Sequence, residues 1–535
     1  MPRGKNLVGI FFRRVRLQWK EGYSPMQDYF TMFDTWNKTV TAQAEILKSF
    51  TEGFNTYNND FLRPLLTAAE VFNNVESTRL MQRTPLDNIN SYLKLFGCNV
   101  DLLSRYYLGT MKVLDQYNQK ESDKLLASWF ATALCLEGEK LDEFLIRQKD
   151  ILQRVLQEYP KAIKAIEPEY GFHFENQPES LFAETERFIL RQVMPSEPGI
   201  TTNDNFKPVI ILPPFVLGAN ILAFLPGEKK SYAHSFANKS IPTYIRIMKD
   251  IHATTAVQTM TLEDDVRDTR FFCNMVKEKH GHKVTLNGYC QGGYSAICNI
   301  LTGELDGLVD ALITCVAPMD GTRSKGLGNL LRDLPEQFND LDYGTKTLAS
   351  GNKVANGDLM GWVYKLKSIE DSGPMVAFVR DIMMLAGQTD VPFKINKTVA
   401  ALNYWLQNER SDIPMSVTEM SFASYNIPVT KDGTLPVTIF GKKLNFRGIK
   451  EKNIRWLLCY GETDDLVEKE VALAPLDYMD IEVTPFPKGH VAIATSWSHP
   501  ESNCALDSVF GSGKCRGPVR FQLDLAEECL KSHEG

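Results

Sequence analysis

The chain has 535 residues, enough for two or three domains, and its 43% hydrophobic and 23% charged content is ordinary for a soluble globular protein. A formal net charge of −7 gives no reason to expect a nucleic-acid partner. Ten cysteines are too sparse for a disulfide scaffold and form no C-x-x-C pair, so we expect no metal site and a reducing, cytoplasmic setting.

The first twenty residues are basic and contain no acidic residue. They interleave apolar and aromatic residues with six cations, Arg3, Lys5, Arg13, Arg14, Arg16 and Lys20. They have neither a long apolar core nor a small-residue cleavage site, which argues against a signal peptide. We predict that residues 1–24 are an N-terminal extension. A disordered tail is favoured over a segment that contacts an anionic or hydrophobic surface.

Residues 25–160 have the pattern of helices. Only three glycines occur between Asn55 and Tyr170, and apolar residues recur at helical intervals, as in Phe130 and Leu134 and again in Ile151 and Val155. This predicts a helical N-terminal domain over residues 25–185. Residues 166–205 contain four prolines and are interpreted as a linker into the next domain.

From residue 206 onward, strands and helices alternate, which predicts a parallel α/β sheet in a domain over residues 186–535. Strands are expected at 208–212, 252–260, 284–287 and 311–316, with a helix capped by Thr261 that ends at Gly281. The uncharged span 208–227 is long enough for a membrane helix, but Pro213, Pro214 and Gly218 argue against one. We therefore expect no transmembrane segment here, but a strand that leads into an active-site loop.

The expected strand that starts at Val284 leads into residues 288–293, which read GYCQGG, and a helical pattern follows. This is a nucleophile elbow with cysteine in place of serine. Gly288 and Gly292 have no Cβ to clash in a tight strand-to-helix turn, and the helix that follows favours a thiolate at Cys290. We therefore predict that Cys290 is a nucleophile.

The alternation stops between about residues 321 and 453, where methionines and aromatic residues accumulate. An insertion at this place is typical of a cap over an active site, in which most of these side chains form the core of the cap itself. The sheet is expected to resume with strands at 454–460 and 481–486. Asp464 follows the first of these strands, and His490 follows the second.

Cys290, Asp464 and His490 have the order nucleophile, acid, base that is typical of the α/β-hydrolase fold. Each follows an expected strand, so all three should meet at the carboxyl edge of the sheet. A thiol nucleophile needs a base within reach, and the base needs an acid to hold its tautomer. Asp464 is favoured over the adjacent Asp465 because Leu466 and Val467 then complete the usual Asp-x-apolar-apolar pattern.

The remaining candidates are less specific. His499 is a weaker alternative base, and His234 lies near the 213–220 loop and is a candidate to line the site. His280 and His282 have the spacing of a metal pair, but without a nearby third ligand a surface position is favoured. We expect the oxyanion hole to use the backbone N–H of Gln291 and that of Phe215 or Val216.

These motifs resemble the polyhydroxyalkanoate synthase family, whose lipase-like box is G-x-C-x-G-G. Residues 213–215 (PPF) resemble the family's Pro-Pro-aromatic loop, residues 464–467 (DDLV) its aspartate motif, and residues 489–490 its Gly-His. The resemblance covers roughly residues 206–497. Three positions depart from it: Glu468 and Lys469 replace the usual Pro-Trp, and Gln291 replaces a commoner leucine.

The resemblance implies a cytoplasmic, homodimeric acyltransferase that associates with polymer granules, polymerises (R)-3-hydroxyacyl-CoA and releases CoA without a cofactor. His490 would activate Cys290, and Asp464 would orient His490. Two alternatives stay open: a hydrolase with the same triad, such as a depolymerase or thioesterase, and a non-catalytic granule scaffold.

Overall fold

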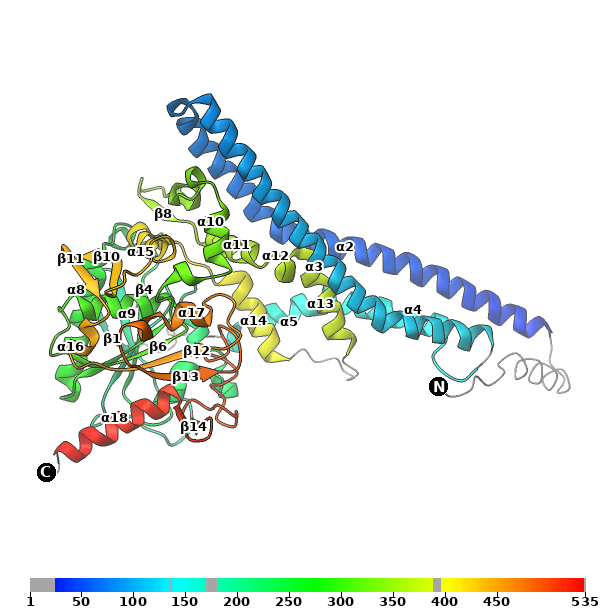
Figure 1. Cartoon of the computed structure of the whole chain (residues 1–535). Coiled ribbons are helices and arrows are strands. Elements are labelled where there is room, and N and C mark those ends of the chain that lie inside the picture. Colours follow the sequence, from blue (N-terminus) through cyan, green and yellow to red (C-terminus); the bar gives the residue numbers. More distant parts are fainter. Residues whose placement is uncertain (1–24, 135, 170, 172–179, 388–395, 534–535) are drawn as a thin grey trace. The chain divides into compact units, whose positions relative to one another are not determined.

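The computed structural model describes residues 25–134, 136–169, 171, 180–387 and 396–533 (Figure 1). The basic extension predicted for residues 1–24 lies outside these residues. The contacts divide the chain into two compact units. The first consists of Met1–Arg63, Leu103–Ala162 and Ile369–Ile395, and the second of Pro64–Leu102, Ile163–Ser368 and Asn396–Gly535.

The described part of the first unit is helical, as the pattern in residues 25–160 predicts. Its helices are α2 (Pro25–Arg79) up to Arg63, α3 (Pro85–Ala133) from Leu103 onward, α4 (Leu141–Gln153), η2 (Arg154–Glu158), α5 (Tyr159–Ala165) up to Ala162, α12 (Ile369–Ser372) and α13 (Pro374–Ala386). A glycine lets α13 pack closely on α2: a Cβ on Gly53 would lie 2.2 Å from the ring of Phe378. The Tyr57 hydroxyl donates to Asp381 at 2.5 Å in the same contact. Residues 369–386, predicted to belong to the cap, thus pack in this helical unit.

The second unit is built on a sheet of eight strands among the described residues. They are β1 (Leu181–Glu184), β2 (Phe188–Gln192), β3 (Val209–Leu212), β4 (Thr243–Met248), β5 (Val284–Tyr289), β6 (Val309–Cys315), β12 (Arg455–Gly461) and β13 (Glu482–Phe486). Their order is β1-β2-β4-β3-β5-β6-β12-β13. The pairs from β4 to β13 are parallel, and β2 is antiparallel to both of its neighbours. This order, with an antiparallel second strand, is that of the α/β-hydrolase fold, and the predicted fold class is confirmed.

Two sequence predictions for this sheet are wrong. Residues 252–260 are not a strand; they form a turn and the short helix α7 (Thr255–Gln258), and the strand is β4, which lies before them. The buried Arg246 interrupts the apolar run of β4 and obscures it in the sequence. The predicted linker 166–205 contains the hairpin β1–β2, because Pro195 and Pro198 come after both strands and interrupt neither.

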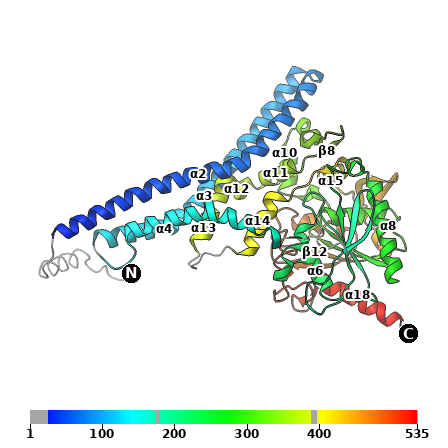
Figure 2. The ribbon, with the colours of Figure 1, turned by 180° about the vertical axis from the view of Figure 1, so that it is seen from behind.

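Helices cover both faces of the sheet: α8 and α9 lie on one face and α6 and α18 on the other, as the opposed views of Figures 1 and 2 show. The helices of this unit that have not yet been given are α6 (Tyr232–Ala237), α8 (Leu262–His280), α9 (Gln291–Leu301), α10 (Leu327–Asp333), α11 (Gly357–Lys367), α14 (Lys397–Asn408), α15 (Met415–Asn426), α16 (Gly448–Glu451), α17 (Lys469–Ala472) and α18 (Pro518–His533). Short strands form three small sheets: β7 (Thr345–Thr347), β8 (Lys353–Ala355) and β9 (Ile413–Pro414); β10 (Thr434–Ile439) and β11 (Lys442–Asn445); β14 (Val509–Phe510) and β15 (Cys515–Arg516). The elements between β6 and β12 occupy the place predicted for a cap.

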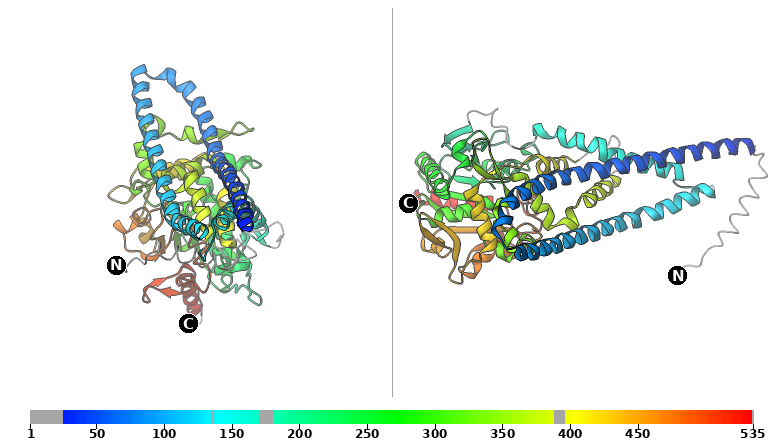
Figure 3. Two further views of the ribbon diagram at one scale, coloured as in Figure 1. Left: turned by 90° about the vertical axis from the view of Figure 1, so that its right-hand side faces the viewer. Right: turned by 90° about the horizontal axis from the view of Figure 1, so that it is seen from above.

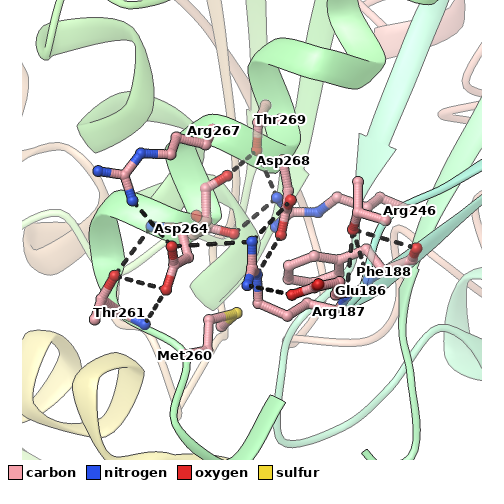
Figure 4. A network of polar contacts seen from close by, with 12 residues as sticks. Glu186, Arg187, Phe188, Arg246, Met260, Thr261, Asp264, Arg267, Asp268 and Thr269 are labelled. Atoms are coloured by element: carbon pink, nitrogen blue, oxygen red, sulfur yellow. Dashed lines mark hydrogen bonds and ion pairs between the residues drawn. The ribbon is translucent and has the colours of Figure 1, made fainter. Parts of the chain in front are cut away.

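A network of charged side chains attaches α8 to the antiparallel edge of the sheet (Figure 4). Arg187 at the start of β2 donates to Asp268 at 2.7 Å. Arg246 of β4 is buried, pairs with Asp265 at 2.7 Å and lies over the ring of Phe188. A capping box at Thr261 starts α8 where the sequence predicts it. Buried charges that are paired in this way hold one register between helix and sheet.

The end of α2 and the start of α3 form a hairpin, visible at the top of the left-hand view in Figure 3. Residues Pro64–Leu102, which include its turn, belong to the second unit. Among the described helices, none has an apolar stretch of the length that crossing a membrane requires.

Candidate active site

Cys290 lies in the turn between β5 and α9 with φ 52° and ψ −124°, a backbone conformation that is strained for any residue with a Cβ. The glycines of the motif are required by close contacts. A Cβ on Gly288 would lie 2.3 Å from the Cα of Gly293, and one on Gly293 would lie 2.6 Å from the Cβ of Ala317. The turn therefore has the geometry of a nucleophile elbow, with Cys290 at its apex.

The structure brings Asp464 and His490 together at the same edge of the sheet. Asp464 follows β12, and its Oδ1 accepts the backbone N–H groups of Leu466 and Val467, each at 2.9 Å. Its Oδ2 accepts a hydrogen bond from Nδ1 of His490 at 2.8 Å. The Tyr289 hydroxyl donates to the backbone oxygen of His490 at 2.7 Å and so ties the histidine loop to the elbow strand. The imidazole is thereby held in one tautomer, with its Nε2 free for the reaction centre.

The charges around His490 favour its protonated form, the imidazolium. Burial lowers the pKa of His490, but the Asp464 carboxylate and then Cys290 outweigh this effect and raise the pKa to about 10. The Nε2 atom is buried and has no hydrogen-bond partner among the described residues. Since Cys290 is close enough to influence the titration of His490, the two side chains can share a proton as a thiolate and an imidazolium.

The predicted oxyanion donors lie around Cys290. Gln291 is the first residue of α9, so its N–H is one of those that a helix leaves without an intrahelical acceptor. The N–H of Val216 donates to the side-chain oxygen of Gln291 at 3.3 Å, a long bond that a substrate oxygen can replace. Phe215 lies on the same loop, with its ring 5.9 Å from the guanidinium carbon of Arg246. The loop and the start of α9 thus present N–H groups from two sides.

A cavity of about 510 Å³ opens at Cys290. Its walls are mostly aliphatic and aromatic and come from α10, α11, α15, the loop after β12 and the α2–α3 hairpin. Tyr364 and Tyr425 line it, and burial raises the pKa of both hydroxyls, so both are neutral donors at physiological pH. The volume is in the range of sites that enclose small organic ligands.

Several other sequence candidates lie elsewhere. His234 lines a separate cavity of about 120 Å³, where its Nδ1 contacts Ser231 at 2.7 Å and burial lowers its pKa to about 4. His499 accepts the N–H of Glu501, a local turn contact. The carboxylate of Asp465 is 77% exposed and pairs with Lys367, so it does not take the place of Asp464.

The expectation of a surface position for His280 is wrong. Its side chain is buried against Tyr244, whose hydroxyl contacts Nε2 at 2.8 Å. Burial lowers the pKa of His280, which therefore packs as a neutral imidazole. Among the described residues, no three His, Cys, Asp or Glu side chains are grouped as metal ligands.

One residue next to the acid was not predicted to matter. Glu468 accepts hydrogen bonds from the hydroxyl of Ser324 at 3.0 Å and from the N–H groups of Lys325 and Gly326 at 3.1 and 2.8 Å. It therefore joins the Asp464 loop to the segment that leads into α10. The sequence signal was its departure from the Pro-Trp of the family that the motifs resemble.

No family model matches this chain, and no curated protein matches it. Similar solved structures include a lipase-esterase related protein from Clostridium acetobutylicum (11% identity, TM-score 0.32, 57% of this chain and 94% of the other covered). They also include an esterase from Thermogutta terrifontis (12%, 0.28, 66% and 97%) and the hydrolase BPHD from Rhodococcus sp. strain RHA1 (12%, 0.31, 59% and 93%). Likeness at this level carries no argument about activity. The α/β-hydrolase fold of this chain rests on its strand order and its elbow.

Proposed function

We propose that this chain is an acyltransferase that forms an acyl-cysteine on Cys290 from a hydroxyacyl-CoA thioester and passes the acyl group to a hydroxyl, as polyhydroxyalkanoate synthesis requires. The observation that carries the proposal is a cysteine at a strained elbow, beside a histidine held by a carboxylate, at the mouth of an apolar cavity. Many activities share this fold, so we infer the activity from the site alone.

In the first half-reaction, the proton of Cys290 passes to His490 and the thiolate attacks the thioester carbonyl. The carbonyl oxygen becomes an oxyanion, for which the N–H groups of Gln291 and of residue 215 or 216 are the donors. When the carbon–sulfur bond to CoA breaks, the His490 imidazolium protonates the CoA thiolate. Asp464 stabilises the imidazolium throughout.

In the second half-reaction, the hydroxyl of another hydroxyacyl unit gives its proton to His490 and attacks the acyl-cysteine. The ester forms as the acyl–sulfur bond breaks, and Cys290 leaves as a thiolate that shares the proton now held by His490. Exchange of one thioester for another is nearly isoenergetic, so a thiol nucleophile suits the first step. No metal or cofactor enters this scheme, and CoA is a product.

The apolar cavity supports transfer to an alcohol over hydrolysis, because water gains little from entering it. A hydrolase with the same three residues is the rival reading and differs only in which hydroxyl resolves the acyl-enzyme. The same proposal includes two partners, a polymer granule surface and a second copy of the chain. It also includes a cytoplasmic location.

Incubation with 3-hydroxybutyryl-CoA separates these readings. The proposal predicts CoA release together with polymer, and no release from Cys290→Ala. Release with free hydroxybutyrate alone would identify a hydrolase. No release from this substrate or from a longer-chain 3-hydroxyacyl-CoA would leave a non-catalytic scaffold.

A further inference from the structure

The cavity at Cys290 is larger than a four-carbon acyl group needs, and one of its walls comes from a segment distant in the sequence. Leu65, Ala68 and Phe72 of α2 and Leu95 and Leu102 of α3 line it. All five belong to the Pro64–Leu102 hairpin, which packs in the same compact unit as Cys290.

A buried polar anchor attaches the hairpin to the neighbouring segment of the insertion. The carboxylate of Glu76 is 3% exposed and accepts the hydroxyls of Tyr92, at 2.5 Å, and Tyr343. Arg79 pairs with Asp340 at 2.9 Å and with Asp342 at 2.5 Å. These contacts link both helices of the hairpin to residues 340–343, so the wall has a defined position and is not a loose flap.

Aromatic rings continue the wall from this anchor toward the cavity. Phe72 stacks on Tyr343 with centroids 5.7 Å apart and lies 5.6 Å from Phe338, which also lines the cavity. The lining of the cavity between these rings and Cys290 is mainly aliphatic and aromatic. Cys98 of the hairpin also lines the cavity, and its thiol donates to the backbone oxygen of Asp333. Such a surface suits a hydrocarbon chain and offers little to a charged group.

We propose that the Pro64–Leu102 hairpin is the specificity wall of the acyl site and that the preferred substrates carry an aliphatic chain well beyond four carbons, whose distal end lies against Ala68 and Leu95. The identity of the group as an acyl thioester rests on the proposed function; the preference for an aliphatic chain at Cys290 does not. Each methylene that enters the cavity adds ~0.8 kcal/mol of favourable burial, which corresponds to about fourfold in rate.

A labelling experiment tests the cavity without requiring turnover. The full chain reacts with N-alkyl iodoacetamides of increasing alkyl length, and alkylation of the Cys290 peptide is followed by mass spectrometry, which separates it from Cys98. The rate should rise by about fourfold per methylene and then level off when the chain fills the cavity. A rate independent of chain length would overturn the proposal, even if the protein turned over 3-hydroxybutyryl-CoA.

Two substitutions place the end of the chain on the hairpin. Ala68→Phe fills the cavity beside the hairpin and should lower the ratio of long-chain to short-chain labelling by about tenfold or more, whereas Leu95→Ala should move the plateau to longer chains. Leu66→Phe is the matched control, since Leu66 is 69% exposed and lies on the same turn outside the cavity. If Ala68→Phe fails to fold, the Leu95→Ala shift decides. An unchanged chain-length profile in the folded hairpin variants would overturn the assignment, as would an equal change in Leu66→Phe.

Discussion

A Cβ on Gly292 would lie 2.1 Å from the backbone oxygen of Leu212, so the start of α9 meets the end of β3 backbone to backbone. The same Cβ would lie 2.6 Å from the oxygen of Pro213. Neither atom can move without shifting the loop that carries Phe215 and Val216. The second glycine of the motif therefore sets the distance between the elbow and the oxyanion loop.

Gly292→Ala should destabilise the sheet unit by at least about 1–3 kcal/mol, because the added methyl group meets backbone and not a flexible side chain. The free energy of unfolding in urea measures this effect. Gly227→Ala is the control, since a Cβ at Gly227 meets nothing within 4 Å. Equal stability of the two variants would contradict the close contact.

The acid can be assigned by a pair of neighbouring substitutions. Asp464→Asn should lower kcat by about 10⁴-fold, because an amide next to Nδ1 of His490 stabilises the wrong tautomer. Asp465→Asn should change kcat little, since its carboxylate is largely exposed. Steady-state kinetics with a hydroxyacyl-CoA measure both, and the reverse result would move the acid by one position.

The pH dependence of kcat/KM follows from the pKa of His490, which is raised from 6.5 to about 10. A raised pKa means that the imidazole keeps its proton across neutral pH and loses it only as the pH approaches 10. The imidazolium that protonates the departing CoA is then lost, so kcat/KM should fall near pH 10 and show no rise through 6.5. The rates are corrected for the background with Cys290→Ala; a rise through pH 6.5 would show that neutral histidine is the active form.

Glu468 should hold the approach to α10 in place. Glu468→Ala leaves the hydroxyl of Ser324 and two N–H groups without their acceptor, which costs about 1–3 kcal/mol. Hydrogen exchange of residues 325–330 should become faster. Glu470→Ala is the control, because the Glu470 side chain is 56% exposed and makes a long ion pair with Lys325, at 3.8 Å. Equal rates of hydrogen exchange in the two variants would show that Glu468 does not hold this segment.

The sheet and the elbow could be predicted because their signals are local. A β-prone run, glycines that the turn requires, and a capped helix each follow from neighbouring residues, and parallel strands bring their carboxyl ends to one edge. The structure accordingly places Cys290, Asp464 and His490 together. β4 escaped prediction because Arg246 lies within its apolar run, and the carboxylate that pairs with it, Asp265, lies on another element, α8.

The cavity wall could not be predicted from the sequence. Apolar spacing in residues 64–102 indicates a buried helix face, but not which other element covers it. The contact between Phe72 and Phe338 joins segments more than 250 residues apart, and the anchoring role of Glu76 depends on Tyr343 in the insertion. For the same reason the sequence assigned residues 369–386 to the cap, although α13 packs on α2.

The most direct test of the account is the chemical state of Cys290 after a brief reaction with 3-hydroxybutyryl-CoA. The reaction is quenched in acid, the chain is digested, and the peptide that contains Cys290 is weighed. The proposed mechanism predicts a thioester-linked hydroxybutyryl group, or a short oligomer of it, on Cys290, with a matching release of CoA. An unmodified Cys290 peptide alongside released CoA, or the acyl group on another residue, would contradict it.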